Sequence, residues 1–233
     1  SETYHLDEFA VRAGELIGDA PTIYLPLPDD SLYAPPGLRA PVTVEHQVAH
    51  SIAATFADRR LSDVTPLVAR LRMVKDRFEI DALRQAARIS AESMVALMHA
   101  VRPGMNDLEA AGLLEHEWKR RGSPRASFAP ILGSGANAMT FFTVMGENYN
   151  AVDRTMRAGE LLFVDYGAAE FRTYASDICR TLPVSGRFSA EQRKYYEIVL
   201  EAQEAAIALI RPGVMMLDVI KAAAAVFRKH GLE

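Results

Sequence analysis

From residue 76 onward, apolar residues recur every three or four positions in four stretches, which is the spacing of amphipathic helices. The first stretch begins at Asp76 and ends at Arg102-Pro103-Gly104, where proline and glycine stop a helix. The second extends from residue 106 to 122, the third from 189 to 210, and the last ends at residue 231. Three of these stretches open with the pattern of a capping box, in which an acceptor side chain is followed three positions later by Glu or Gln: Asp76 with Glu79, Asn106 with Glu109, and Ser189 with Gln192.

Short apolar runs between the predicted helices indicate strands. These runs cover residues 129–132, 139–145, 161–164 and 174–179. Gly133-Ser134-Gly135, with the Ala-Asn that follows, is predicted to be a turn between strands. Its glycine spacing matches neither the dinucleotide-binding fingerprint nor the P-loop, so a phosphate-binding role is not favoured.

Residues 1–70 have a different pattern. A short helical periodicity covers residues 6–17, an apolar strand-like run covers 22–27, and the proline-rich stretch 26–41 is predicted to be loop. His46 and His50 stand at i and i+4 in a predicted helix, which is a spacing that can bind metal. Since no Glu lies between them and no third ligand is near in the sequence, we interpret them as ordinary helix residues.

The helical part of the chain contains an internal repeat. Arg102-Pro103-Gly104 recurs 109 positions later as Arg211-Pro212-Gly213, and the same offset places Gly122 on Gly231 without a gap. Chance similarity between amphipathic helices is the alternative, but the identical tripeptide and the matched glycines exceed what periodicity alone requires. We interpret the chain as a duplicated unit of two helices followed by strands. The strands that would follow the second helix pair are expected beyond Glu233.

Two aspartates fall in neighbouring predicted strands. Asp165 closes the apolar run 161–164, and Asp177 lies within the run 174–179. A turn centred near Phe171 would make these runs an antiparallel hairpin and would place the two aspartates roughly opposite each other, with Cβ atoms about 5 Å apart. Two half-buried carboxylates at that distance repel unless they share a proton or bind a cation. The pattern therefore predicts a divalent metal at Asp165 and Asp177.

Composition narrows the class of protein. A net charge of −4 argues against the basic surface that binding to nucleic acid requires. Charged residues at the start of the chain argue against a signal peptide, and no run of 18 apolar residues predicts a membrane span. Cys179 is the single cysteine, so a disulfide scaffold within one chain is excluded and a reducing compartment is favoured. We expect a cytoplasmic protein that binds neither nucleic acid nor membrane.

His116 and Glu117 are adjacent on a predicted helix. Because neighbouring residues of a helix do not share a face, we interpret both side chains as solvated.

Residues 71–231 resemble the pita-bread metallopeptidases, which include aminopeptidase P, prolidase and, more distantly, methionine aminopeptidase and creatinase. The resemblance rests on several motifs spread over some 160 residues, and together they are specific. The matching stretches are Leu71-Arg72-Met73-Val74-Lys75-Asp76, Arg88-Ile89-Ser90-Ala91-Glu92, Val101-Arg102-Pro103-Gly104-Met105, Gly133-Ser134-Gly135-Ala136-Asn137-Ala138, Val164-Asp165-Tyr166-Gly167-Ala168, and the segment from Tyr174 to Phe188.

The resemblance implies an α+β chain with the pita-bread (creatinase/aminopeptidase) fold. Residues 71–233 would supply the first half of the catalytic domain and the two helices of the second half, and residues 1–70 would be the tail of an α/β N-terminal creatinase-like domain. Asp165 and Asp177 fall on two of the family's metal ligands, and the remaining ligands, one His and two Glu, would come from the second half, after Glu233. The implied cofactor is a pair of divalent ions (Mn, Co or Zn). The implied activity is hydrolysis of the peptide bond before a proline at the second position of a peptide, by a homodimer.

Three departures from the family pattern affect this expectation. No histidine occurs between Glu117 and Lys229, so the family's substrate-side histidine is missing, and Phe141 or Phe142 occupies that region. The hairpin between the aspartates has one extra residue, which could change its register. Cys179 stands where the family commonly has threonine. The chain's own residues therefore offer metal ligands but no catalytic residue, and two alternatives stay open: a catalytically impaired pita-bread protein that acts as a binding module, and a related non-peptidase hydrolase.

Overall fold

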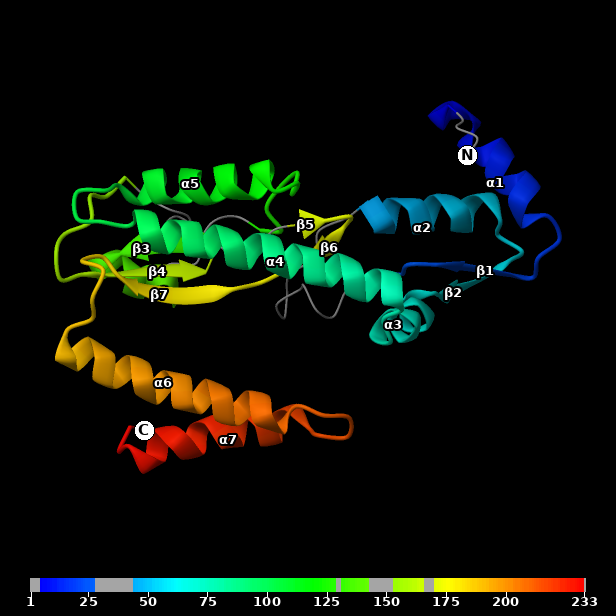
Figure 1. The fold of residues 1–233 in the computed structure, drawn as a ribbon. Coiled ribbons are helices and arrows are strands. Elements are labelled where there is room, and N and C mark those ends of the chain that lie inside the picture. Colours follow the sequence, from blue (N-terminus) through cyan, green and yellow to red (C-terminus); the bar gives the residue numbers. More distant parts are fainter. Residues whose placement is uncertain (1–4, 28–43, 129–130, 143–152, 166–169, 233) are drawn as a thin grey trace, which may run out of the picture. The chain divides into compact units, whose positions relative to one another are not determined.

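The computed structural model describes residues 5–27, 44–128, 131–142, 153–165 and 170–232. The chain forms two compact units, residues 1–76 and residues 77–233. Figure 1 shows the helices and strands of both. The assignment of residues 1–70 to an N-terminal domain and of 71–233 to a catalytic domain stays a prediction.

The first unit is a small α/β piece. After a short 3-10 turn at Leu6–Glu8, helix α1 (Phe9–Ile17) leads into strand β1 (Thr22–Leu25). Helix α2 (Val44–Thr55) precedes strand β2 (Arg60–Asp63), and helix α3 (Thr65–Met73) closes the unit. Strands β1 and β2 pair in parallel, so the chain between them must cross over. The helix and strand predicted at the start of the chain are confirmed, while the proline-rich stretch lies outside the described residues from position 28 on.

The second unit begins with two long helices. Helix α4 (Arg77–Ala100) and helix α5 (Asp107–Arg120) are followed by strand β3 (Ile131–Ser134), a 3-10 helix η3 (Gly135–Phe142), and strand β4 (Leu161–Asp165). A small hairpin of strands β5 (Glu170–Phe171) and β6 (Tyr174–Ala175) leads to strand β7 (Cys179–Pro183). Helix α6 (Ala190–Leu209) and helix α7 (Met216–Lys229) complete the unit.

Strands β3, β4 and β7 form an antiparallel sheet in that order. Strand β4 alternates between partly exposed and fully buried positions, as expected for a strand with one face on the core. Its buried residues Leu162 and Val164 join a cluster with Ile89 and Leu97 of α4 and Trp118 of α5. This core fixes the strand that ends at Asp165.

Two local predictions between β3 and β4 are wrong. Residues 139–142 lie in η3 instead of a strand, and residues 143–145 are outside the described part of the chain. Gly133 and Ser134 belong to β3 itself, and the chain turns only at Gly135, whose φ of +55° favours glycine. A short apolar run does not distinguish a strand from a helical turn, because its periodicity is too brief.

The repeat is visible in the two helix pairs. Helix α7 starts and ends 109 positions after α5, and α6 ends 109 positions after α4. The loops have the same conformation, with φ of +90° at Gly104 and +89° at Gly213. Even the polar contacts correspond, because Glu92 pairs with Arg121 in the first copy and Glu201 pairs with His230 in the second. The helix starts at Asn106 and Ser189 are capping boxes, as predicted.

The two copies differ in burial. In α4 and α5 the side chains that face the sheet are buried, among them Ala86, Ser90 and Ala111. Their counterparts 109 positions later, Tyr195, Val199 and Ile220, are exposed. The described part of the chain therefore covers the inner face of the first helix pair and leaves that of the second pair open. No helix among the described residues is both long and apolar enough to cross a membrane.

Candidate metal centre

Asp165 lies at the end of a strand that is held on both sides. In the ladder it pairs with Ile131 of β3 and with Cys179 of β7. Val164, the residue before it, is fully buried in the core. The backbone that carries the Asp165 carboxylate is therefore held by a paired strand on each side.

The predicted pairing of Asp165 with Asp177 is wrong in register. The residue opposite Asp165 is Cys179, and Asp177 lies two positions earlier on the same chain segment. The cause is the position of the turn, because Phe171 pairs with Tyr174 and the chain reverses at Arg172 and Thr173 instead of at Phe171. Because the chain reverses later than predicted, Asp177 lies diagonally across from Asp165 instead of directly opposite it.

Asp165 nevertheless lies within electrostatic reach of Asp177. Burial raises the pKa of Asp165, and the negative charge of Asp177 raises it further. Partial burial also raises the pKa of the Cys179 thiol to about 11, with a contribution from the charge of Asp165. The thiol is thus protonated at neutral pH.

The carboxylates of Asp165 and Asp177 fit part of a divalent metal's ligand set. Carboxylate oxygens are hard donors of the kind that Mn²⁺ and similar ions accept, and a bound cation would relieve the repulsion that raises the pKa of Asp165. Within the described ranges of the chain, no three His, Cys, Asp or Glu side chains gather into a group that could hold a metal by itself. A tight site needs more donors than these two.

The histidines considered from the sequence do not join this centre. His46 and His50 lie on α2 in the first unit, and no metal-binding cluster is found there among the described residues. His116 is exposed on α5. The solvated interpretation is wrong for its neighbour Glu117, which is only 9% exposed and forms ion pairs with Arg120 and Arg121. Phe141 and Phe142 lie in η3, but their side chains are not among those described.

Sequence reasoning missed a buried polar cluster at the other end of β3. Asp107, at the start of α5, is fully buried and its Oδ2 atom accepts a hydrogen bond of 3.1 Å from the backbone N–H of Ser134. Arg154 donates to the Ser134 hydroxyl at 2.6 Å and forms a two-bond ion pair with Glu160 at 2.6 and 2.8 Å. No sequence signal pointed to this cluster, since Asp107 and Ser134 are 27 positions apart and share no motif.

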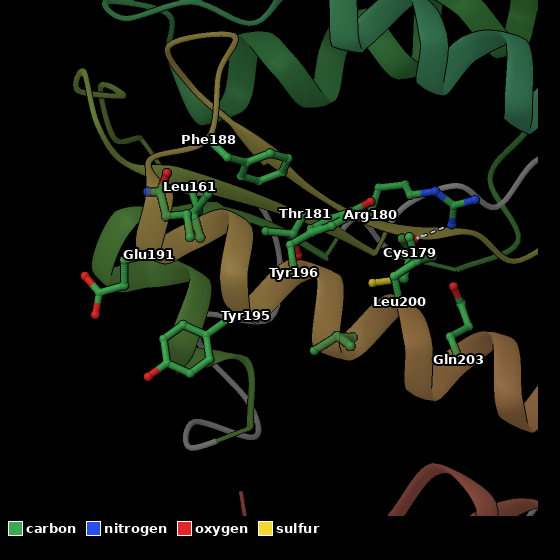
Figure 2. A pocket seen from close by; sticks show the side chains of 12 residues that line it. Leu161, Cys179, Arg180, Thr181, Phe188, Glu191, Tyr195, Tyr196, Leu200 and Gln203 are labelled. Atoms are coloured by element: carbon green, nitrogen blue, oxygen red, sulfur yellow. Dashed lines mark hydrogen bonds between the residues drawn. The ribbon is translucent and has the colours of Figure 1, made fainter. Parts of the chain in front are cut away.

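A cavity of about 590 Å³ lies between β7 and α6. Figure 2 shows Arg180 and Thr181 of β7 and Tyr196 and Leu200 of α6 among the side chains that line it. Cys179, the strand partner of Asp165, lies at its wall. The cavity is part of the open inner face of the second helix pair described above.

Comparisons with known proteins agree with this architecture. Residues 81–233 match metallopeptidase family M24. The chain is 37% identical over 163 residues to the Xaa-Pro aminopeptidase of Escherichia coli K12. The aligned segment covers 70% of this chain and 35% of that protein. It is 31% identical over 213 residues to the Xaa-Pro aminopeptidase of Haemophilus influenzae, covering 91% of this chain and 45% of the relative.

Solved structures give the same result. The X-Pro aminopeptidase of Thermotoga maritima superposes with a TM-score of 0.78 at 27% identity, over 99% of this chain and 59% of that one. A Glu383Ala variant of E. coli aminopeptidase P in complex with substrate superposes with a TM-score of 0.78 at 27% identity, over 98% of this chain and 50% of the other. The chain thus spans between a third and a half of the length of these curated relatives and has the mixed helix and sheet architecture of the pita-bread fold. The family match covers more than half of the chain, and the chain belongs to metallopeptidase family M24.

Proposed function

We propose that this chain supplies part of the catalytic domain of a metal-dependent Xaa-Pro aminopeptidase, and that Asp165 and Asp177 are metal ligands. The observation that carries the proposal is the partly buried carboxylate of Asp165 at the end of β4, held between β3 and β7 with Asp177 in the segment just before β7, in a chain of family M24. The relatives named above are Xaa-Pro aminopeptidases, which favours a peptide with proline at its second position as substrate.

Each aspartate would have a distinct structural task. Asp165, fixed in the ladder, would set the position of the metal against the sheet. Asp177 would add a donor from the segment between β6 and β7 and would lower the repulsion by sharing the cation. A divalent ion held there supplies two things: a more acidic bound water and a polarised peptide carbonyl. Two ions per site, their identity as Mn, Co or Zn, a homodimer and a cytoplasmic location stay predictions.

A second candidate function is a binding module of the same fold without peptidase activity. It is favoured by the absence of histidine between Glu117 and Lys229, because an aromatic side chain at Phe141 or Phe142 cannot donate a hydrogen bond to a developing oxyanion. The two aspartates favour the peptidase, since a scaffold has no use for a partly buried carboxylate at Asp165 beside the negative charge of Asp177.

Hydrolysis of Xaa-Pro peptides by the complete gene product separates the two functions. We expect release of the N-terminal residue in the presence of Mn²⁺, and a loss of at least about 100-fold in Asp165→Asn. A protein that binds Mn²⁺ through Asp165 but leaves Xaa-Pro peptides intact would contradict the peptidase and support the binding module. Activity that is unchanged in Asp165→Asn would contradict the ligand assignment.

A further inference from the structure

Asp165 and Asp177 are held by different kinds of structure. Asp165 belongs to a three-stranded ladder, with a paired residue on each side. Asp177 lies in residues 176–178, which belong to neither β6 nor β7. The position of Asp177 must therefore depend on contacts made by its neighbours in the chain.

The hairpin that leads to Asp177 has an unfavourable turn. Arg172 and Thr173 have φ of +51° and +69°. Among the described residues, they are the two that have a positive φ without being glycine. Two-residue turns of this type prefer Asn and Gly, and a β-branched residue such as Thr173 rarely adopts this conformation. The turn sequence does not favour the hairpin by itself, so contacts with the rest of the unit must hold it.

One strand of the hairpin is attached to helix α4 and the other to the segment that follows α5. On the β6 side, the Tyr174 hydroxyl donates a hydrogen bond of 2.7 Å to Glu79 of α4. On the β5 side, Glu170 forms an ion pair of 2.6 Å with Arg125 and its backbone N–H donates to the Ser123 hydroxyl at 3.0 Å. These contacts fix the two strands of the hairpin but end at Tyr174, three positions before Asp177.

Contacts reach both neighbours of Asp177: Ile178 packs against the hydrophobic core, and Ser176 contacts α4 through its hydroxyl group. The hydroxyl groups of Ser90 and Ser176 are 2.6 Å apart and share a hydrogen bond. Ser90 is fully buried on α4 beside Ile89, which belongs to the hydrophobic core. A rigid helix thereby holds the backbone from which Asp177 projects.

We propose that Ser90 is a positioning residue for the metal centre, which acts through the Ser176 hydroxyl to hold Asp177 in reach of Asp165. The inference rests on the proposed assignment of the two aspartates as metal ligands. Its physical basis is that carboxylates of like charge repel, so Asp177, outside any ladder, moves away from Asp165 unless an anchor opposes the repulsion. Groups that orient metal ligands in this way commonly change metal affinity by 10- to 100-fold.

The chain offers a matched control on the same helix. Ser93 is as fully buried as Ser90, but its hydroxyl donates to the backbone carbonyl of Ile89 within α4 at 2.7 Å. Ser93→Ala thus removes a buried hydroxyl from α4 without touching the hairpin. Ser176→Thr keeps the hydroxyl at a partly buried position and serves as the conservative variant.

The test is a Mn²⁺ titration of the complete gene product, with free Mn²⁺ measured by electron paramagnetic resonance. Ser90→Ala and Ser176→Ala should raise the Mn²⁺ Kd by about 10-fold or more, while Ser93→Ala and Ser176→Thr should stay within about twofold of the wild type. A Kd in Ser90→Ala and Ser176→Ala equal to that of Ser93→Ala overturns the proposal.

Amide hydrogen exchange without metal separates this inference from the ligand assignment. If Ser90 anchors the segment, exchange at residues 174–178 is faster in Ser90→Ala than in Ser93→Ala, and equal exchange overturns the anchor. Asp165→Asn and Asp177→Asn test the ligands themselves, since Mn²⁺ binding that survives in both contradicts the metal assignment whatever the exchange shows.

Discussion

Both the backbone conformation and the surrounding side chains restrict position 135 to glycine. A β-carbon added at this position would lie 2.6 Å from Nη2 of Arg154 and 2.7 Å from Oε1 of Glu160, and its φ of +55° is unfavourable for any residue with a side chain. The ion pair of Arg154 and Glu160 thus occupies the space that a side chain would need. The turn from β3 into η3 depends on glycine for both reasons.

We therefore expect Gly135→Ala to lower the free energy of unfolding by about 2 to 4 kcal/mol, the sum of backbone strain and overpacking. Gly112→Ala is the control, because Gly112 lies within α5 with open space around its Cα and no positive φ. That change should stabilise the protein by up to about 1 kcal/mol. Urea denaturation of both variants measures the difference, and equal stabilities would contradict the crowding at Gly135.

The same ion pair predicts a pH dependence. Hydrogen bonds from Arg154, helped by the backbone N–H of Arg157, lower the pKa of Glu160 from its ordinary 4.5 to about 2, against the opposing effect of burial. Because the folded pKa is below the unfolded one, the stabilisation is present above pH 4.5 and is lost as the pH falls toward 2. The contribution of this ion pair to the free energy of unfolding therefore changes with pH only in the acid range.

Glu160→Gln should accordingly lower the free energy of unfolding by about 1 to 2 kcal/mol at pH 7. The difference between wild type and variant should shrink steadily as the pH is lowered from about 5 to 3. Denaturation curves at several pH values give this difference directly. A gap between the two proteins that stays constant over that range would show that the Glu160 charge does not carry the interaction.

At the scale of elements, the two copies of the repeat differ at one helix start. Asn106 caps α5 with a full capping box, and its counterpart 109 positions later is Met215, which makes no side-chain cap for α7. The backbone is nonetheless the same, with φ and ψ of −92° and 147° at Asn106 and −82° and 144° at Met215. The second copy thus retains the geometry of a cap but lacks the acceptor.

Met215→Asn should therefore stabilise the chain by about 1 kcal/mol, because an Asn side chain at this position can accept from the free N–H groups of the first turn. Asn106→Ala, the reverse change in the first copy, should cost a similar amount. Thermal unfolding of the two variants and the wild type checks both signs. A loss of stability in Met215→Asn would mean that the correspondence between the copies does not extend to their helix starts.

The elements also show how far the sequence allows prediction. The long helices and the capping boxes were predictable, since periodicity and caps are local signals. The caps at Asn106 and Ser189 are confirmed, and the one at Asp76 stays a prediction. The register of the aspartate hairpin was not, because it depends on Arg172 and Thr173 adopting positive φ, which their residue types disfavour. The buried cluster of Asp107, Ser134, Arg154 and Glu160 was missed because its contacts join distant parts of the chain.

At the scale of the whole molecule, the chain contains one complete copy of the helix and sheet unit and the helices of a second. The first sheet buries its helices, while Tyr195, Val199 and Ile220 of the second pair stay exposed. The relatives are two to three times longer than the segment they share with this chain. The candidate metal site is likewise only partly formed by this chain, because two carboxylates provide only part of the donors that a tight divalent site requires.

The most direct test of the central claim is the affinity of the complete gene product for Mn²⁺ in the wild type and in Asp165→Asn, Asp177→Asn and Asp81→Asn. Asp81 is an exposed acid on α4 and controls for the loss of one negative charge. We predict that the first two variants lose at least about 10-fold in affinity, while Asp81→Asn binds as the wild type does. Mn²⁺ binding that is undiminished in both Asp165→Asn and Asp177→Asn would contradict the claim that this hairpin holds the metal.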